Sequence, residues 1–445
     1  MNRYFSAFTA VILSLFAVSC TGETVDYSEP PVTPPSSPSV EVTELPDDIP
    51  DVAPPTIPSA PLSSIPAETI RQFNDFSLNF YLANSKDSHE NVCVSPLSVG
   101  AVLGMIANGD DGAARDGILS VLGLEESAEG LDALNAYYRI LLSNLPNIEE
   151  SITCDVTNTL WCDPTKYRIR KSFMEAIAYS YYAYGIGISP NGEAGKNAIN
   201  EFVGKNTNGL IDNFLTSPLQ INLAFLNTIY FKAGWSNGFD ISMTSKGKFL
   251  SIDGQEKETD FMWRCDMTEY SVTDDGTEAI RLNYGENARF SMTCILPSSR
   301  INHIPLDEAL SADNLNAIGK NMKEEYMIVR LPKFEVEMNN PNTLDILKDL
   351  GLDSASSVQS PAKFGLITEA NNFFLNLFIH ATKIKVDENG TEGAAVSLGG
   401  MDGAGGPGDA NSHIREILFD RPFIFCIREN TTGAILFIGS VKTFS

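Results

Sequence analysis

Hydrophobic and polar residues change their spacing along the chain. In the first part, apolar side chains recur at helical intervals, which predicts helices near 70–81, 96–109, 131–145, 173–184 and 194–206. Ser95-Pro96 is typical of a helix start, because serine caps a helix and proline suits its first position. Later apolar runs predict strands at 221–232, 279–284, 290–296, 327–336, 373–386, 423–427 and 434–441, with an earlier one at 152–161. Helices followed by strands indicate an α+β fold with large sheets.

The segment that follows the strand predicted at 373–386 has an unusual composition. Ile384 and Val386 alternate with polar residues, and the alternation stops at Glu388-Asn389-Gly390. Residues 391–410 then contain seven glycines and no lysine, arginine or aromatic residue. Loops of about 20 residues without structure are uncommon in compact domains and are usually functional or disordered. We therefore expect a long, mobile loop here.

The same loop has the pattern of a strand that could be buried. In an extended chain, alternate side chains lie on opposite faces. One face would carry Thr391, Gly393, Ala395, Ser397, Gly399 and Met401. The other face would carry Glu392, Ala394, Val396, Leu398, Gly400 and Asp402. Both charges fall on the second face, so the first face is small and uncharged and could be buried inside an existing sheet.

These features resemble the reactive-centre loop of the serpins, a family of serine protease inhibitors. The resemblance rests on Glu388, Gly390 and Thr391 in the proximal hinge and on the small run Gly393, Ala394, Ala395 and Val396. It continues after the loop in Phe419–Phe423 and Gly433–Gly439. Earlier segments that resemble the family, in the same order, are Asn91–Ser98, Ile199–Asn200 with Thr207–Gly209, Asn227–Trp235, Leu331–Phe334 and His380.

The resemblance implies a serpin fold with three β-sheets, about eight or nine helices and an exposed reactive-centre loop. It also implies a shutter of polar groups that lets the main sheet part and reseal, formed by Ser95, Ser98, Asn227 and His380. Trp235 matches the tryptophan of the breach, where loop insertion starts. A histidine within an apolar run is most often a hydrogen-bonded core residue, and at His380 the structural and functional interpretations coincide.

The family's usual spacing from Glu388 implies a reactive bond between Ala404 and Gly405. The segment after Gly405 is longer than the family pattern, so the bond between Met401 and Asp402 is the alternative. A small side chain at the cut suits elastase-like or subtilisin-like proteases. Trypsin-like enzymes would find no lysine or arginine between Lys385 and Arg415.

Residues 1–20 have the features of a lipoprotein signal peptide. Arg3 supplies the positive charge, Phe5–Val18 is apolar but too short for an ordinary membrane span, and Ala17–Cys20 resembles a bacterial lipobox. We expect Cys20 to become the lipidated first residue of an exported protein that is anchored to a bacterial membrane, either in the periplasm or at the outer surface.

Residues 21–66 are predicted to be a Pro-rich acidic linker, and the resemblance implies that residues 67–445 are a single serpin domain. The linker holds 12 of the 24 prolines and no lysine or arginine, so it cannot build a core. Roughly 45 extended residues of about 3.1 Å each would span on the order of 140 Å.

Composition excludes several classes of function. A formal charge of −26 without a basic patch argues against nucleic acid and against direct binding of anionic lipid, which leaves the acyl chain as the only membrane link. The chain lacks Gly-x-Ser-x-Gly, His-Glu-x-x-His and a phosphate-binding glycine loop, and Ser245–Lys248 is formally Ser-x-x-Lys in what reads as an exposed turn. Without Cys-x-x-Cys, a zinc site is not expected, and the six cysteines after Cys20 are predicted to be mostly buried free thiols.

We therefore expect a monomeric inhibitor rather than an enzyme, without metal or cofactor. The resemblance implies that a serine protease, or in some cases a cysteine protease, attacks the loop and is trapped in a covalent 1:1 complex when the cut loop inserts into the main sheet. The alternative is a non-inhibitory serpin that acts as a surface binding module, although such relatives usually carry bulky or charged hinge residues where this chain has Gly393-Ala394-Ala395.

Overall fold

The computed structural model describes residues 10–20, 60–86, 88–146, 149, 151–211, 213–298, 318–319, 321–356, 364–368, 373–390 and 414–444. Its helices are α1 (Ala67–Ser85), α2 (Pro96–Ala107), α3 (Ala113–Val121), α4 (Ala128–Asn144), α5 (Lys171–Tyr181), α6 (Gly192–Asn206), α8 (Thr343–Asp349) and α9 (Asp353–Ser356), with short 3-10 turns η1 (Leu62–Ser64) and η2 (Ile241–Met243). In this part of the chain, no helix is both long enough and apolar enough to cross a membrane.

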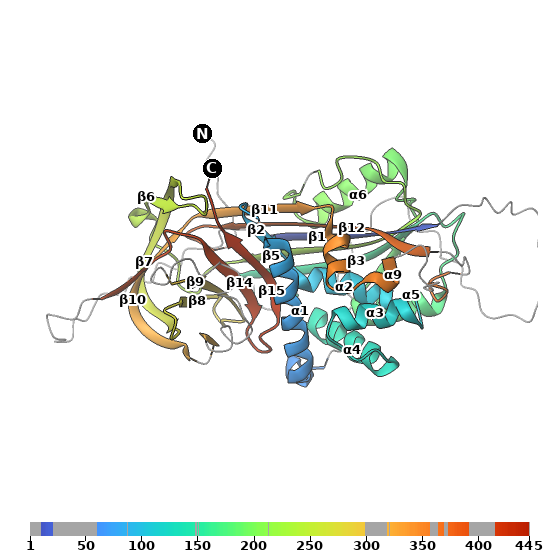
Figure 1. Ribbon diagram of the computed structural model, residues 1–445, viewed down its shortest axis with the longest axis horizontal. Coiled ribbons are helices and arrows are strands. Elements are labelled where there is room, and N and C mark those ends of the chain that lie inside the picture. The colour runs from blue at the N-terminus through green and yellow to red at the C-terminus, as the bar shows by residue number, and fades with distance from the viewer. Residues whose placement is uncertain are drawn as a thin grey trace, which may run out of the picture.

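The strands form two hydrogen-bonded sheets (Figure 1). The six-stranded sheet has the order β11 (Phe334–Asn340), β12 (Phe373–Val386), β1 (Ala10–Cys20), β5 (Leu223–Ala233), β3 (Ile152–Cys162) and β4 (Tyr184–Ile186). The nine-stranded sheet contains β13 (Arg415–Leu418), β10 (Lys323–Pro332), β7 (Glu256–Val272), β8 (Glu278–Tyr284), β9 (Phe290–Leu296), β14 (Phe423–Glu429), β15 (Ile435–Val441) and β2 (Val92–Val94), and β6 (Ser245–Leu250) pairs with β7.

β7 has two different sets of neighbours within the nine-stranded sheet. Its first part pairs with β6 and β10, and its last four residues pair with β8. The nine-stranded sheet thus divides at β7 into one part with β6, β10 and β13 and another with β8, β9, β14, β15 and β2. With the six-stranded sheet this makes three, and the predicted α+β fold with three sheets is confirmed.

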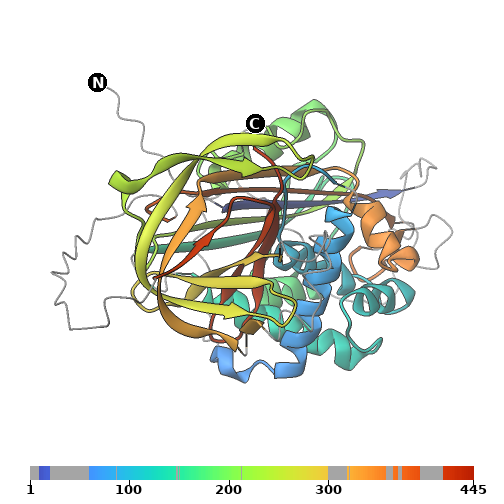
Figure 2. The same cartoon turned by 60° about the vertical axis from the view of Figure 1, so that its left-hand side comes forward.

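The six-stranded sheet is covered on both faces. Figures 1 and 2 show α6 on one side of it and the other large helices, with the second sheet, on the opposite side. Side chains of β5 alternate between two apolar clusters: Phe225, Ile229 and Phe231 join the main one, and Ala224, Leu226 and Tyr230 join the one under α6. A strand buried on both faces reads as a continuous apolar run, which is why the sequence of β5 shows little alternation.

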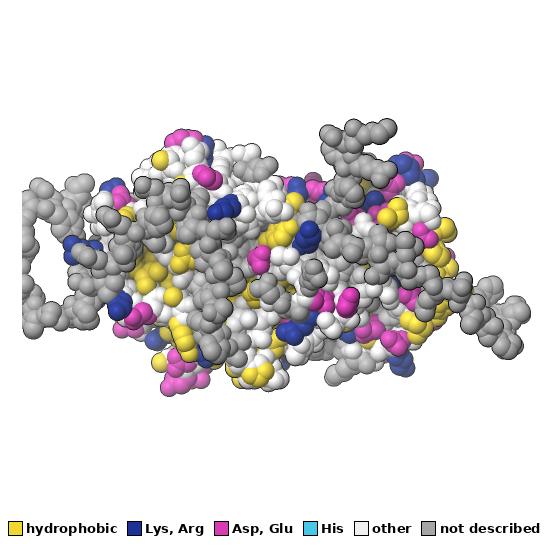
Figure 3. Space-filling view, turned by 180° about the vertical axis from the view of Figure 1, so that it is seen from behind, with side chains coloured by type: hydrophobic (Ala, Val, Ile, Leu, Met, Phe, Trp, Pro, Cys, Tyr) yellow, Lys and Arg dark blue, Asp and Glu magenta, His cyan; other side chains and the backbone are white. Residues whose placement is uncertain are grey.

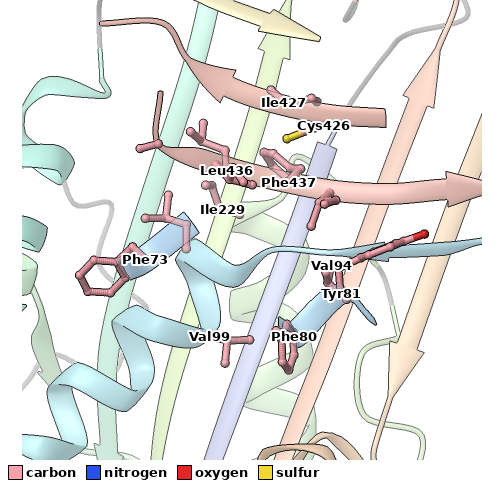
Figure 4. Close-up of a cluster of buried hydrophobic side chains, with 14 of the residues drawn as sticks. Phe73, Phe80, Tyr81, Val94, Val99, Ile229, Cys426, Ile427, Leu436 and Phe437 are labelled. Atoms are coloured by element: carbon pink, nitrogen blue, oxygen red, sulfur yellow. The ribbon is translucent and has the colours of Figure 1, made fainter. Parts of the chain in front are cut away.

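The main core lies between the two sheets and the first helices. The close-up of Figure 4 labels members of this cluster: Phe73, Phe80 and Tyr81 come from α1 and Val99 from α2, and the others come from β2, β5, β14 and β15. Phe80, Tyr81 and Phe437 are fully buried. Segments far apart in sequence therefore meet in the main core.

The first strand occupies an unexpected place. Ala10–Cys20, which the sequence predicts to be part of a leader, lies between β12 and β5 and runs antiparallel to both. It separates two strands that would otherwise be neighbours in the sheet. Removal of this leader during export stays a prediction.

Three local expectations are corrected by the structure. The strand predicted at 327–336 is two strands, because β10 ends at Pro332 in one sheet and β11 begins at Phe334 in the other. Ser245–Lys248 lies in strand β6, paired with β7, and is not a turn. The packed part of the chain starts before Ala67, since Leu62 and Ile65 are buried in the main cluster.

Candidate functional site

The polar residues predicted for the shutter come together beneath the strand position occupied by β1. His380 of β12 and Asn227 of β5 both lie opposite Ser14 in the backbone register, so they flank β1 at the same level. Ser95 and Ser98 belong to the start of α2, which packs below the same strands. All four predicted side chains are at most 1% exposed.

The N-cap of α2 is hydrogen-bonded to both of the strands that flank β1. Ser95 caps the helix by accepting a hydrogen bond from the Ser98 amide at 3.2 Å, and its hydroxyl donates to the Leu436 carbonyl at 2.7 Å. The Ser95 amide donates to His380 Nε2 at 3.0 Å. The Ser98 hydroxyl donates to Asn227 Oδ1. One helix terminus thus holds polar groups from both strands that border β1.

The network extends to a residue that sequence reasoning missed. Asn227 Nδ2 donates to Asn158 Oδ1 at 2.7 Å, and Asn158 Nδ2 donates to the Tyr181 carbonyl at 2.8 Å. Asn158 lies on β3 directly opposite Asn227 and is 1% exposed. The sequence does contain a signal for Asn158, because it is an asparagine inside an otherwise strand-forming run. A buried side-chain amide in such a run needs hydrogen-bond partners.

Trp235, which the sequence predicts to mark the breach, lies two residues beyond the end of β5. The indole is 7% exposed, and its ring stacks on Tyr284 with centroids 4.5 Å apart. Its Nε1 donates to the Asp387 carbonyl at 2.9 Å, and its backbone amide donates to the Asn389 carbonyl at 3.2 Å. Trp235 therefore fixes the turn by which the chain leaves β12.

The turn requires glycine at position 390. Gly390 has φ +99°, in the left-handed region, and pairs with Gly234 and Asp387. A Cβ at Gly390 would lie 2.5 Å from the Trp235 amide nitrogen and 2.6 Å from the Ala233 carbonyl. Both the backbone conformation and the available space exclude a side chain here.

Glu388 anchors the hinge by its carboxylate. It is 5% exposed, accepts a hydrogen bond from the Thr244 hydroxyl at 2.7 Å and pairs with Lys333 Nζ at 3.0 Å. Burial by itself raises the pKa of Glu388, but the hydrogen bonds from Thr244 and Lys333 outweigh burial and lower the pKa below 4.5. The carboxylate is therefore ionised and held in place at neutral pH.

The remaining predicted residues are placed as follows. The backbone of Cys20 lies at the end of β1, opposite Phe373. Thr391, Gly393, Ala394, Ala395, Met401, Asp402, Ala404 and Gly405 lie outside the described residues. Cys93, Cys154, Cys162, Cys294 and Cys426 are buried free thiols, and Cys265 is half-buried and also free. Burial raises the pKa of Cys93 and of Cys162 to about 12, so these thiols are not reactive at neutral pH.

Comparison with known families identifies the architecture. Residues 71–443 match the model of the family described as "Serpin (serine protease inhibitor)". The chain belongs to the serpin family.

Similar proteins come from distant organisms. Serpin-Z2A of Triticum aestivum is 30% identical over 380 residues, which cover 81% of this serpin and 91% of the wheat protein. A serpin-like protein of Thermococcus kodakarensis is 31% identical over 380 residues, covering 83% and 84% of the two chains.

Solved structures agree on the fold. The thermophilic serpin tengpin in its native state superposes with a TM-score of 0.72 at 26% identity, covering 87% of this serpin and 98% of tengpin. Human thyroxine-binding globulin, crystallised with thyroxine, gives a TM-score of 0.73 at 23% identity, covering 85% and 98%. This last likeness concerns the fold alone.

The first prediction concerns the shutter. Ser98→Ala removes the hydroxyl that donates to the buried Asn227 amide oxygen, and such a loss costs about 1–3 kcal/mol. We expect denaturant unfolding to show a lower free energy of unfolding by this amount. Ser143→Ala is the matched control, because the half-buried Ser143 hydroxyl donates to the Ile140 carbonyl and accepts from Asn144, both within its own helix. Equal effects of the two substitutions would contradict a special role for the network.

The second prediction concerns pH. Because the pKa of Glu388 is lowered in the folded serpin, its stabilisation is present above pH 4.5 and is lost as the pH falls through the lowered pKa. Glu388→Gln should reduce the free energy of unfolding by about 1–3 kcal/mol at neutral pH, and the difference from wild type should shrink in acid. Glu337→Gln, at an ion pair whose glutamate is 61% exposed, should change little at either pH. A Glu388→Gln effect that does not depend on pH would refute this assignment.

Proposed function

We propose that this serpin inhibits serine-type endopeptidases as a suicide substrate, by inserting its cut reactive-centre loop between β12 and β5. The observation that carries the proposal is the strand position that Ala10–Cys20 fill in the full-length chain, with antiparallel partners on both sides. The loop starts from the same place. After β12 the chain turns within Asp387–Gly390, and a strand that continues from such a turn lies antiparallel to β12.

The register that an inserted loop would have beside β12 supports the proposal. If the pairing of Asp387 with Gly390 continued along β12, Thr391, Gly393, Ala395 and Ser397 would lie opposite Val386, Ile384, Thr382 and His380. Residues directly opposite in a sheet share a face, and these four β12 residues are at most 1% exposed. The small, uncharged face of the loop would thus be the buried one.

One charge of the loop, Glu392, would meet a complementary side chain. In the same register Glu392 lies opposite Lys385, whose side chain is 36% exposed. A glutamate there faces a cation at the sheet surface, so it needs no burial. The loop would also bring Ser397 to the level of the shutter, where Ser14 of β1 lies between His380 and Asn227.

The proposed chemistry is acyl transfer followed by a trap. The serine oxygen of the protease attacks the carbonyl carbon of Ala404, the bond to Gly405 breaks, and the Gly405 nitrogen leaves with a proton as a new amino terminus. The acyl group stays on the serine as an ester. Insertion of the freed strand then competes with hydrolysis of that ester by water, and each backbone hydrogen bond gained contributes roughly 0.5–1.5 kcal/mol. The uncut form is therefore held by kinetics.

Export would make the strand position available. We propose that residues 1–19 are removed and that Cys20 carries the lipid, so the mature serpin lacks almost all of β1. The Pro-rich segment between Cys20 and the packed domain would then act as a stalk on the outside of a bacterial membrane.

The third prediction tests insertion. Thr391→Arg would bury an unpaired charge at the start of the inserted strand, which is very costly. We expect elastase to cut this variant without forming a covalent complex on a denaturing gel, whereas the wild type should form one. Thr391→Val is the matched control, because it replaces the same side chain with an uncharged one of similar size and should still trap. Full trapping by Thr391→Arg would argue against insertion, and simple cleavage of the wild type would favour the non-inhibitory alternative.

The fourth prediction tests the anchor. Cys20→Ser removes the thiol that would be acylated, so the protein should leave the membrane fraction and appear in the soluble fraction of expressing cells. Trapping of elastase should be unchanged, because the stalk separates the anchor from the domain. Radiolabelled palmitate should label the wild type alone, and persistence of the variant in membranes would exclude a lipoprotein anchor at Cys20.

A further inference from the structure

The leader strand β1 lies where the cut loop would have to go. Ala10–Cys20 run lengthwise inside the six-stranded sheet and pair with β12 within Phe373–Lys383 (Figure 1). Only the last three residues of β12, Ile384–Val386, have no partner in β1. In the register described above, an incoming loop could pair Thr391–Gly393 with these three residues and would then meet the leader. Insertion would therefore stop almost as soon as it began.

The leader and the loop match each other at the centre of this strand position. Ser14 lies opposite His380, which is where the continued register of the loop places Ser397. The next residue of both segments is leucine, Leu15 in the leader and Leu398 in the loop. Both segments run antiparallel to β12, so each brings a serine to the level of the shutter and a leucine one residue further. The leader is thus a mimic of the loop within the same chain.

The composition of the leader suits a central strand better than that of the loop. Ala10–Cys20 contain no glycine, proline or charged residue, whereas residues 391–401 contain three glycines and a glutamate. Glycine weakens a strand because it loses more conformational freedom and has no side chain to pack. The loop is also held at its distal end, since β13 pairs with β10 in the other sheet. Full entry of the loop requires a cut or the separation of β13, whereas the leader occupies the position in the intact chain.

The surface of the molecule is a poorer place for the leader than the sheet. An extended strand of 11 residues, at about 3.3 Å each, is roughly 36 Å long. On the face shown in Figure 3, hydrophobic side chains of the described residues lie in several separate groups, with charged side chains between them. An uncharged strand of this length would have to cross such charges. Inside the sheet it has backbone partners on both sides.

We propose that the leader is an autoinhibitory strand of the precursor. A precursor that folds with residues 1–19 attached is cut in its loop but does not trap the protease, because the strand position is already filled. Removal of the leader, rather than folding, produces the active inhibitor. Chains that fold before export therefore do not trap proteases of the cell that makes them. This inference rests on the inhibitory function proposed above and adds its control.

The experiment compares precursors made by cell-free translation without membranes, which keep their leader, with the exported wild type purified from membranes. If the leader fills the position in more than about 90% of precursor molecules, the yield of covalent elastase complex should be at least about tenfold lower than for the exported protein. The precursor should instead show simple cleavage on a denaturing gel.

A substitution in the leader should restore trapping by the precursor. Ile12 lies opposite Thr382 and Ile229, which are both fully buried, so Ile12→Arg would place an unpaired charge between them and expel the leader. Phe5→Arg is the matched control, because it introduces the same charge before Ala10, the first residue of β1, and should leave the precursor unable to trap.

Melting temperatures provide a second measurement that does not depend on trapping. Cleavage of the loop should leave the melting temperature of the wild-type precursor unchanged, because its sheet is already complete. The same cleavage should raise the melting temperature of the exported protein and of the Ile12→Arg precursor, whose cut loop can fill the position. An equal rise in all three would contradict a leader that fills the sheet.

The outcomes separate this inference from the function on which it rests. A wild-type precursor that traps as fully as the exported protein overturns the autoinhibition and leaves the inhibitory function intact. Restored trapping by Phe5→Arg as well as by Ile12→Arg also overturns it. An exported wild type that forms no covalent complex overturns both proposals. If Ile12→Arg does not fold, Ser14→Arg, opposite His380 and Asn227, replaces it.

Discussion

Backbone pairing on both sides of a single strand position is the constraint on which the six-stranded sheet depends. β12 and β5 do not pair with each other, and each presents its hydrogen-bonding groups to the strand between them. Buried backbone groups without partners are costly, so this position strongly favours being filled. Ala10–Cys20 fill it in this structure, and under the proposed function the loop after Gly390 would be the competing segment. The proposed mechanism thus depends on which part of the chain lies there.

The polar layer below that position is what the proposed insertion would need if the sheet is to part within a closely packed core. Apolar packing is lost when two strands separate, whereas hydrogen bonds can be exchanged one for another at little net cost. Ser95 and Ser98 contact the two strands from one helix terminus, so His380 and Asn227 remain linked through α2 whatever lies between them. The N-cap of a helix therefore also serves as the link across the opening.

The sequence predicted what depends on local pattern. β12, the break at Glu388–Gly390 and the cap at Ser95 follow from alternation, a glycine turn and the preference of serine for helix starts. Long-range pairing was not accessible: the division between β10 and β11 depends on which sheet each strand joins, and the double role of β7 depends on two different neighbours.

The same limit applies to the site. Asn158 belongs to the polar network only because it lies opposite Asn227. The place of Ala10–Cys20 was missed for another reason, since an apolar leader and a buried strand have similar compositions.

In the proposed inhibition, the length of β12 limits how far the end of an inserted loop could move along the sheet. Its 14 residues, at about 3.3 Å each, measure roughly 46 Å, comparable to the diameter of a protease domain. Because Glu388 and Trp235 hold one end of the loop fixed, an inserted strand could lengthen only away from them, and its far end would travel nearly the whole sheet. The separation of three positions between Met401 and Ala404 then corresponds to about 10 Å of travel. The choice of scissile bond would thus determine how hard the trapped enzyme is pressed against the far edge of the inhibitor.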